Sequence, residues 1–429
     1  MIKDFASRLT RQPRPHDPGV AADTARLFAD LSADLRGFLA ATAACAPYLW
    51  GLMQREETWL RQALTQDPDH ALDADLAALA DLTVETLAPG LRQMKRRAAL
   101  WTALCDIGGL WPLETVTTTL TTFADRAVDL TLQRLVADEI RRGKLPGATP
   151  DDAATAGGMV ALAMGKMGAH ELNYSSDIDL ICLFDETRYS GAEHEARAAF
   201  IRVTRRMAAT LSDITDGYVF RTDLRLRPDA SVTPVCISMA AAEAYYEAEG
   251  RTWERAAYIK ARPCAGDIAA GNRFLKTLTP FVWRRHLDFA AIQDAHDMRL
   301  RIRDHRGLRG AITVEGHDMK LGQGGIREIE FFTQTRQLIA GGRDPDLRAR
   351  ATVPGLAALA AKGWLPPEVA RDLTTHYRQH REIEHRLQMV LDEQTHRMPA
   401  TADGVARIAA FMDQDLPAAM SPAQGRALI

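Results

Sequence analysis

The segment spanning residues 161–184 constrains the fold of this chain more than any other. It reads ALAMGKMGAHELNYSSDIDLICLF, in which an apolar strand-type run ends in a GKMG turn and a second strand-type run opens at Asp177. Because side chains alternate between the two faces of a strand, Asp177 and Asp179 are expected on the same face. Neighbouring carboxylates repel unless a cation lies between them, and their hard oxygen ligands suit Mg²⁺ bound jointly with phosphates. The pattern therefore predicts a metal and phosphate site at the end of a strand.

A third carboxylate follows in the segment GYVFRTDLRLRPD, residues 217–229. Its alternation predicts a strand whose apolar face is formed by Tyr218, Phe220, Thr222, Leu224 and Leu226. Asp223 then lies on the opposite face, between Arg221 and Arg225. A glycine loop with three aspartates supplies the parts that two-metal phosphoryl or nucleotidyl transfer requires. The alternative is that the aspartates only cap and solvate a strand end and that GKMG is an ordinary turn.

Composition excludes several classes of protein. Hydrophobic residues make up 46% and charged residues 25% of the 429 residues, an ordinary globular mixture. The net charge of −3 argues against a general nucleic-acid binder, so an anion site has to be local. The five cysteines form no CxxC pair, which indicates neither a disulfide framework nor a zinc ribbon. We therefore expect a reducing, cytoplasmic location.

Two segments could be mistaken for a signal peptide or a membrane span, and neither has the required features. The N-terminal sequence MIKDFASRLTRQPRPHDPG has charges and prolines where a signal peptide needs an apolar core. Residues 37–53 carry no charge, but they are short for a membrane span and are interrupted by Pro47. We expect a buried helix end there, and no membrane partner.

The spacing of hydrophobic residues divides the chain into three parts. Residues 1–142 show helical spacing, and the stretch GKLPGATPDDAATAGG that follows is typical of a boundary. Residues 143–267 alternate strand-type runs with helical segments, and helical spacing returns over residues 268–429. We therefore predict an α+β protein with an N-terminal helical region, a catalytic core and a C-terminal helical bundle.

The order of a glycine loop, a DxD strand and a later aspartate resembles the DNA polymerase β-type nucleotidyltransferase superfamily. One departure is that the loop has Gly165-Lys166 where that superfamily usually has Gly-Ser. More narrowly, five ordered motifs resemble the bifunctional glutamine synthetase adenylyltransferase/adenylyl-removing enzymes: GKMGAHELNYSSDIDL, DGYVFRTDLRLRPD, EGRTWERAAYIKARP, KLGQGGIREIEFF and HRLQMVLDEQTHRMP. The resemblance is close over residues 91–399 and looser in the N-terminal helices.

This resemblance implies a polymerase β-like nucleotidyltransferase core flanked by helical regions. It implies that Asp177, Asp179 and Asp223 are catalytic and hold Mg²⁺, as two ions. The implied nucleotide- or phosphate-binding residues are Gly165, Lys166, Gly168, Ser176, Arg221, Arg225 and Lys260. The implied partners are glutamine synthetase as protein substrate, phosphate with ADP or ATP, and a PII-type regulator.

Enzymes of this family carry two related halves, of which one attaches AMP to a tyrosine of glutamine synthetase and the other removes it by phosphorolysis. The motifs ELNYSSDIDL, YVFRTDLRLRP and GRTWERAAYIKAR resemble the removing half, whereas the other half typically reads closer to ELGYGSDLDL. We therefore expect removal of AMP with release of ADP. Two alternatives stay open: ATP-dependent adenylylation of glutamine synthetase, and a regulatory module that binds without catalysis.

Two further motifs place cations near this core. In EGRTWERAAYIKARP, helical spacing after Gly250 predicts one helix that carries Lys260 and Arg262. These cations either reach substrate phosphates or form the solvated basic end of a helix docked on the sheet. In KLGQGGIREIEFF, glycines precede a helix, a shape that either binds an anion or closes the bundle onto the core. The resemblance favours a position facing the cleft for Lys320, Arg327, Glu328 and Glu330.

Some charged stretches have an ordinary structural interpretation. His376 and His380 lie one helical turn apart with His385 nearby, but the surrounding Arg and Glu residues favour a solvated or family-specific helix face over a metal site. The basic run of Arg92, Lys95, Arg96 and Arg97 and the Arg-rich stretch 299–309 suit either an acidic partner or exposed helix faces.

Overall fold

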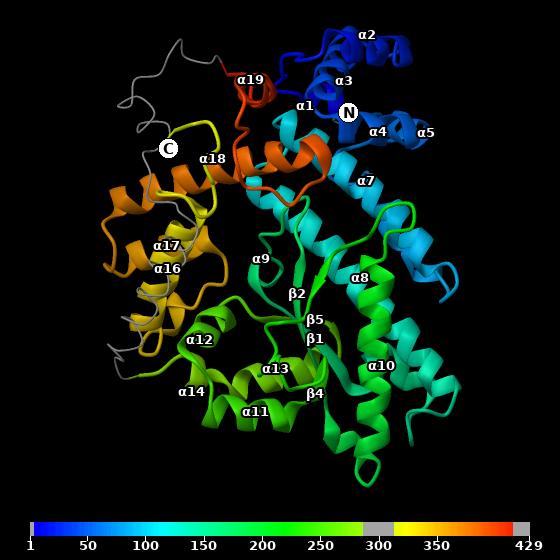
Figure 1. Ribbon diagram of the computed structural model, residues 1–429, viewed down its shortest axis with the longest axis vertical. Coiled ribbons are helices and arrows are strands. Elements are labelled where there is room, and N and C mark those ends of the chain that lie inside the picture. Colours follow the sequence, from blue (N-terminus) through cyan, green and yellow to red (C-terminus); the bar gives the residue numbers. More distant parts are fainter. Residues whose placement is uncertain (1–3, 286–312, 415–429) are drawn as a thin grey trace.

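The computed structural model describes residues 4–285 and 313–414. Within these ranges helices surround one small mixed sheet, so the predicted α+β class is confirmed (Figure 1). The helices before the sheet are α1 (Phe5–Arg8), α2 (Pro18–Leu27), α3 (Ala33–Cys45), α4 (Pro47–Arg55), α5 (Glu57–Ala63), α6 (Asp73–Ala78), η1 (Leu79–Asp81), α7 (Leu87–Ile107), α8 (Leu113–Arg141) and η2 (Pro150–Gly158). None of the described helices is both long and apolar enough to cross a membrane.

The sheet has five strands in the order β3-β2-β1-β5, with β4 also paired to β2. Their bounds are β1 (Met159–Ala163), β2 (Ile178–Phe184), β3 (Thr222–Asp223), β4 (Cys236–Ser238) and β5 (Arg262–Gly266). β1 runs antiparallel to both β2 and β5, whereas β2 is parallel to β3 and β4. Every residue of β1 is buried, as the run MVALA predicts for a central strand.

The two faces of the sheet belong to different hydrophobic clusters. Ile178 and Leu180 point into the large cluster that contains the N-terminal helices together with α7 and α8. Ile181 and Leu183 point the other way, against α11 (Met239–Ala248), α13 (Ile268–Thr277) and α14 (Thr279–Val282). The strict alternation along β2 follows from the pleat of the strand. Asp179 therefore lies on the same face as Ile181 and Leu183, near the start of β2.

The structure corrects two predicted elements, one strand and one helix. The strand expected over residues 218–226 is reduced to β3, because the Asp223 carboxylate accepts a hydrogen bond from the Arg225 amide and the chain turns there. The helix expected across EGRTWERAAYIKARP ends at Tyr258 as α12 (Thr252–Tyr258), and Arg262 opens β5 instead. The sheet hydrogen bonds offered by β1 outweigh the weak local preference of the sequence RPCAG.

The C-terminal helices stand beside the sheet and reach across it (Figure 1). The remaining elements are α9 (Gly165–Gly168), η3 (Glu186–Tyr189), α10 (Glu193–Ser212), α16 (Ile326–Ala340), η4 (Pro345–Leu347), α17 (Thr352–Ala361), α18 (Pro367–Leu391) and α19 (Ala402–Phe411). The first part of α18 packs with α16 and α17, and Met389 near its end joins the cluster of the N-terminal helices. This long helix thereby connects the bundle with both other parts of the protein.

Candidate active site

The three predicted aspartates come together at one end of the sheet. Asp179 is paired in register with Asp223 across the parallel strands β2 and β3, and Asp177 directly precedes β2. One carboxylate oxygen from each of Asp177, Asp179 and Asp223 lies within 4.8 Å of the other two. All three residues are partly exposed. The site is therefore an open, three-carboxylate cluster of the kind that binds divalent cations.

Asp179 and Asp223 lie in different electrostatic environments. Burial, followed by the charges of Asp177 and Asp223, raises the pKa of Asp179 to about 7. Hydrogen bonds from Arg225 instead lower the pKa of Asp223. Since Asp179 gains most from an added positive charge, a divalent cation bound by the three carboxylates fits the electrostatics of this site.

Glycine is required at position 165 for two physical reasons. Gly165 has φ +53°, in the left-handed region, and a Cβ atom there would lie 2.6 Å from the Asp179 Oδ2 atom. The absence of a side chain therefore allows the turn after β1 to approach the carboxylate closely. Gly168 has a structural role, because a Cβ atom there would lie 2.2 Å from the Lys260 carbonyl oxygen. The GKMG segment itself forms the short helix α9.

Lys166, which the sequence predicts to bind phosphate, is paired with a carboxylate of the C-terminal part. Its ammonium nitrogen lies 3.1 Å from the Glu384 Oε1 atom on α18, and the Glu384 side chain is fully buried. Although burial alone would raise the pKa of Glu384, the charges and hydrogen bonds of Lys166, His396 and Arg381 hold it well below its ordinary value. Lys166 therefore joins the glycine loop to α18 by a buried ion pair.

Lys260 also forms ion pairs with carboxylates. Its ammonium group lies 2.9 Å from Glu171 and 2.7 Å from Glu330, and all three side chains are buried. Burial alone would lower the pKa of Lys260, but the two carboxylates raise it. Arg262 pairs with Asp125 at 2.8 Å. Lys260 and Arg262 therefore do not form the solvated basic helix end that the sequence offered as one interpretation.

The two arginines beside Asp223 hold parts of the site in place. Arg221 donates to both the carbonyl and the hydroxyl oxygen of Ser175 at 2.8 Å, two residues before Asp177. Arg225 bonds the Asp223 carboxylate through its side chain, and its own side chain is 84% exposed. Ser176 is partly exposed between these groups. Of the two predicted phosphate-binding arginines, the exposed Arg225 is therefore the one that a substrate can reach.

Two residues from the C-terminal part act on the cluster: Gln394, which the sequence analysis did not single out, and Lys320, which the resemblance placed facing the cleft. Gln394, after α18, donates from Nε2 to the Asp177 Oδ1 atom at 2.9 Å. The positive charge of Lys320 acts on Asp179 and lowers its pKa, opposing the effect of burial. Both residues lie in motifs with a recognisable sequence, but no local pattern could show that they meet an aspartate more than 140 positions away.

The segments that carry these two residues are paired with each other. The Met319 amide donates to the His396 carbonyl oxygen at 2.8 Å, and the Met398 amide donates to the His317 carbonyl oxygen at the same distance. Asp318 and Arg397 form an isolated antiparallel bridge between them. This pairing places the KLGQGG loop and Gln394 on the same side of the site. On α16, directly after that loop, Glu328 accepts from the Gly324 amide, and Arg327 lies 3.6 Å from the buried Glu330.

The histidines of α18 and the basic residues of α7 have mainly structural contacts. His385 is buried and contacts Asp106 through Nδ1 at 3.0 Å, while His376 is exposed, so the helix is solvated at His376 and buried at His385. Among the described residues, the aspartate cluster is the only group of His, Cys, Asp and Glu side chains suited to a metal. Lys95 is buried against Phe220, and Arg96 and Arg97 pair with Glu56. The Arg-rich stretch 299–309 lies outside the described residues.

A small mixed sheet with a glycine turn and three clustered carboxylates defines a nucleotidyltransferase core. Residues 36–277 match the family model described as glutamate-ammonia ligase adenylyltransferase, and residues 296–423 match that of GlnD PII-uridylyltransferase. The chain belongs to the glutamate-ammonia ligase adenylyltransferase family, which is a family of nucleotidyltransferases.

Relatives in three bacteria share the name bifunctional glutamine synthetase adenylyltransferase/adenylyl-removing enzyme. The Rhodopseudomonas palustris protein is 45% identical over 96% of this chain and 44% of its own length. The Bradyrhizobium sp. protein is 50% identical over 88% of this chain and 39% of its own length. The Xanthobacter autotrophicus protein is 49% identical over 87% and 39%. The chain thus spans less than half of the length of these curated relatives.

Proposed function

We propose that this chain removes AMP from an adenylylated tyrosine of glutamine synthetase by phosphorolysis. The observation that carries the proposal is the cluster of Asp177, Asp179 and Asp223, with ligand atoms within 4.8 Å of one another. The names of the relatives support glutamine synthetase as the protein substrate. The direction is supported by the motifs ELNYSSDIDL and GRTWERAAYIKAR, which resemble the removing half of the family.

The three carboxylates would hold Mg²⁺, in agreement with their oxygen chemistry and with the raised pKa of Asp179. When bound, the metal supplies charge stabilisation for the phosphoryl oxygens as they react. The protein contributes the geometry of the site. Gln394 fixes the Asp177 carboxylate, Arg225 holds Asp223, and Gly165 leaves the space that Asp179 occupies.

In the proposed reaction an oxygen of HPO₄²⁻ attacks the α-phosphorus of the adenylyl group, and the bond from phosphorus to the tyrosine oxygen breaks. The proton of the attacking phosphate ends on the tyrosine oxygen, so that ADP and unmodified tyrosine are released. Positioning and electrostatic stabilisation dominate such transfers, so a cation for the incoming phosphate is needed near the carboxylates.

Lys320 is the lysine best suited to bind the incoming phosphate. Lys166 and Lys260 already face buried carboxylates, whereas the Lys320 ammonium forms no hydrogen bond or ion pair within the described residues. Its charge nevertheless acts on Asp179, which places it in electrostatic contact with the cluster. The match of residues 296–423 to the PII-uridylyltransferase model supports a PII-type regulator as a further partner.

The decisive experiment measures the transfer of labelled inorganic phosphate into ADP. Purified chain is incubated with adenylylated glutamine synthetase, Mg²⁺ and ³²P-labelled inorganic phosphate, and labelled ADP is the expected product. Asp177→Asn should abolish this product with an unchanged melting temperature, while Asp213→Asn, an exposed aspartate outside the cluster, should retain activity. AMP as the product would mean hydrolysis.

Two other results would replace the proposal. Labelling of unmodified glutamine synthetase from α-labelled ATP, without any release from the modified form, would show that the chain adenylylates instead. Inactivity in both directions by a folded protein that still binds nucleotide would favour a regulatory module.

A further inference from the structure

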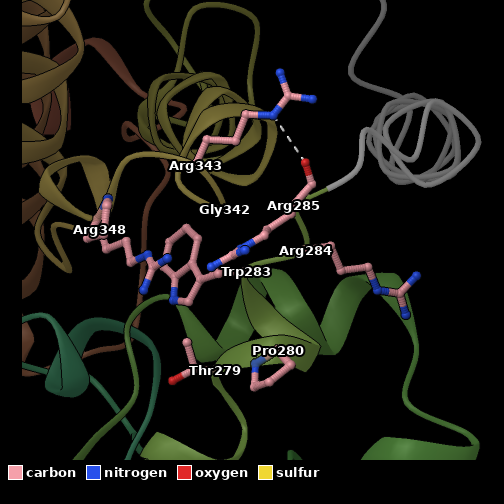
Figure 2. Close-up of a pocket in the computed structure, with 9 residues that line it drawn as sticks. Thr279, Pro280, Trp283, Arg284, Arg285, Gly342, Arg343 and Arg348 are labelled. Atoms are coloured by element: carbon pink, nitrogen blue, oxygen red, sulfur yellow. Dashed lines mark hydrogen bonds between the residues drawn. The ribbon is translucent and has the colours of Figure 1, made fainter.

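A cavity lies apart from the aspartate cluster, where the end of α14 meets the loop between α16 and α17. Its volume is about 750 Å³, within the range of pockets that hold small molecules. It is lined by Thr279, Pro280, Trp283, Arg284, Arg285, Gly342, Arg343, Pro345 and Arg348 (Figure 2). Four of these nine residues are arginines, and none of the nine carries a carboxylate.

Two of the pocket's arginines, Arg343 and Arg348, have no carboxylate partner in the part of the chain that the structure describes. Asp344 and Asp346 lie in the same loop, but both pair with Lys362, at 3.0 and 2.8 Å. Within residues 4–285 and 313–414, neither Arg343 nor Arg348 forms an ion pair with an acidic side chain. Burial alone lowers the pKa of Arg348, as expected for a guanidinium without a carboxylate partner. An anion in the pocket would therefore meet the positive charges of Arg343 and Arg348.

Hydrogen bonds from Nε hold Arg343 and Arg348 in place. Arg343 donates from Nε to the Arg285 carbonyl oxygen at 3.2 Å (Figure 2). Arg348 donates from Nε to the Gly341 carbonyl oxygen at 2.7 Å. The Arg348 guanidinium also lies 5.3 Å from the centre of the Trp283 ring. Guanidinium groups fixed in this way are suited to bidentate contacts with phosphate oxygens.

Close backbone packing forms the floor of the pocket. A Cβ atom on Gly342 would lie 2.0 Å from the Arg284 carbonyl oxygen, so only glycine lets the two segments approach this closely. One of these segments belongs to the helices that cover the sheet, and the other belongs to the C-terminal bundle. A ligand in the pocket would contact both.

We propose that this pocket binds a phosphate-bearing small molecule of nucleotide size, held by Arg343 and Arg348 and sensed by Trp283. The site uses none of the residues of the aspartate cluster, so the proposal stands whether or not the proposed phosphorolysis is correct. ADP and inorganic tripolyphosphate are suitable probes, because they share the phosphate chain and only one carries a nucleoside.

The test is fluorescence titration of the full chain with each probe in buffer containing EDTA, which suppresses binding at the aspartate cluster. We expect a saturable change in the wild-type protein that is lost in Trp283→Phe. In the Arg343→Ala/Arg348→Ala double variant the midpoint should rise at least tenfold, and Arg348→Lys, which keeps the charge but not the fork of donors, should weaken binding less. A response to tripolyphosphate alone would assign recognition to the phosphate chain, and a stronger response to ADP would show that the nucleoside contributes.

The matched control is Arg371→Ala/Arg378→Ala, which removes two exposed arginines of α18 outside the pocket. The proposal is overturned if this control shifts the midpoint as much as the pocket variant does, or if millimolar ADP and tripolyphosphate leave the Trp283 signal unchanged. Tighter binding of an acidic peptide than of either phosphate compound would also overturn it, because the pocket would then be a protein docking site. Unchanged melting temperatures show that the variants are folded.

Discussion

Replacement of Gly165 by alanine tests whether the glycine turn exists to make room for a reacting carboxylate. The added Cβ atom would lie 2.6 Å from the Asp179 Oδ2 atom, and ordinary contact begins at 3.4 Å, so the carboxylate oxygen must retreat by about 0.8 Å. Oδ2 is the free end of a side chain, which can rotate away without moving the backbone. The fold should therefore tolerate the substitution while the geometry of the carboxylate cluster does not.

The matched control is Gly191→Ala. Gly191 also has a positive φ, of +80°, but a Cβ atom there meets nothing within 4 Å. Both substitutions place alanine in the left-handed region and should lower the free energy of unfolding by about 1 to 2 kcal/mol. In a chain of this size that corresponds to a fall in melting temperature of at most a few degrees. The difference between the two variants then isolates the clash with Asp179.

Activity is measured as phosphate-dependent release of ADP from adenylylated glutamine synthetase, with the Mg²⁺ concentration varied. A displacement approaching 1 Å in a catalytic group costs about 100-fold in rate, so Gly165→Ala should lose about 10- to 100-fold in kcat and require more Mg²⁺. Gly191→Ala should remain within about twofold of the wild type. Equal activity in the two variants would refute the role assigned to the glycine.

Four further expectations follow from the same contacts. Lys320→Ala should raise the KM for phosphate about tenfold or more with a smaller effect on kcat, and Lys320→Arg should restore most of the affinity; an unchanged KM would place the phosphate elsewhere. Glu384→Gln removes the partner of two buried cations and should cost about 3 to 5 kcal/mol in a denaturant titration, whereas the exposed Glu368→Gln should be nearly neutral. Leu180→Asp puts a charge into the buried cluster and should abolish cooperative melting, so a soluble variant with a sharp transition would contradict the assigned strand face. Because the metal-free pKa of Asp179 is about 7, Mg²⁺ has to displace its proton below that pH; calorimetry in two buffers should show proton release there and an apparent affinity that falls as the pH is lowered, and equal heats in both buffers would argue against Asp179 as a ligand.

The carboxylate cluster was predictable because its signals are local. Strand alternation places Asp177 and Asp179 on one face, and the apolar runs around them identify the central strands β1 and β2. The third carboxylate, Asp223, required only that a nearby segment pair with β2 in parallel. That pairing holds although β3 contains just two residues. The central strands and this part of the site could therefore be derived from the sequence.

The cations could not be assigned in the same way, because their partners are distant in sequence. A lysine in a glycine loop looks suited to phosphate, and nothing near Lys166 indicates that Glu384 from α18 neutralises it. The same holds for Lys260, whose partner Glu330 lies 70 positions further along the chain. Strand β5 was missed for a related reason, since its short sequence has little strand preference and its formation depends on pairing with β1.

These ion pairs also bear on how the core and the bundle depend on each other. Glu330 and Glu384 reach from α16 and α18 into the core, where they are the counter-charges of Lys260 and Lys166. A fragment ending near residue 267 would lose both carboxylates, and it would also lose the Gln394 contact to Asp177. Lys166 would then either lose its proton or be exposed to water, and either change disturbs the glycine turn next to Asp179, while Lys260 would keep only Glu171. The C-terminal part therefore contributes to the candidate active site, supplying the charges that keep the loop in place as well as the cation proposed to bind phosphate.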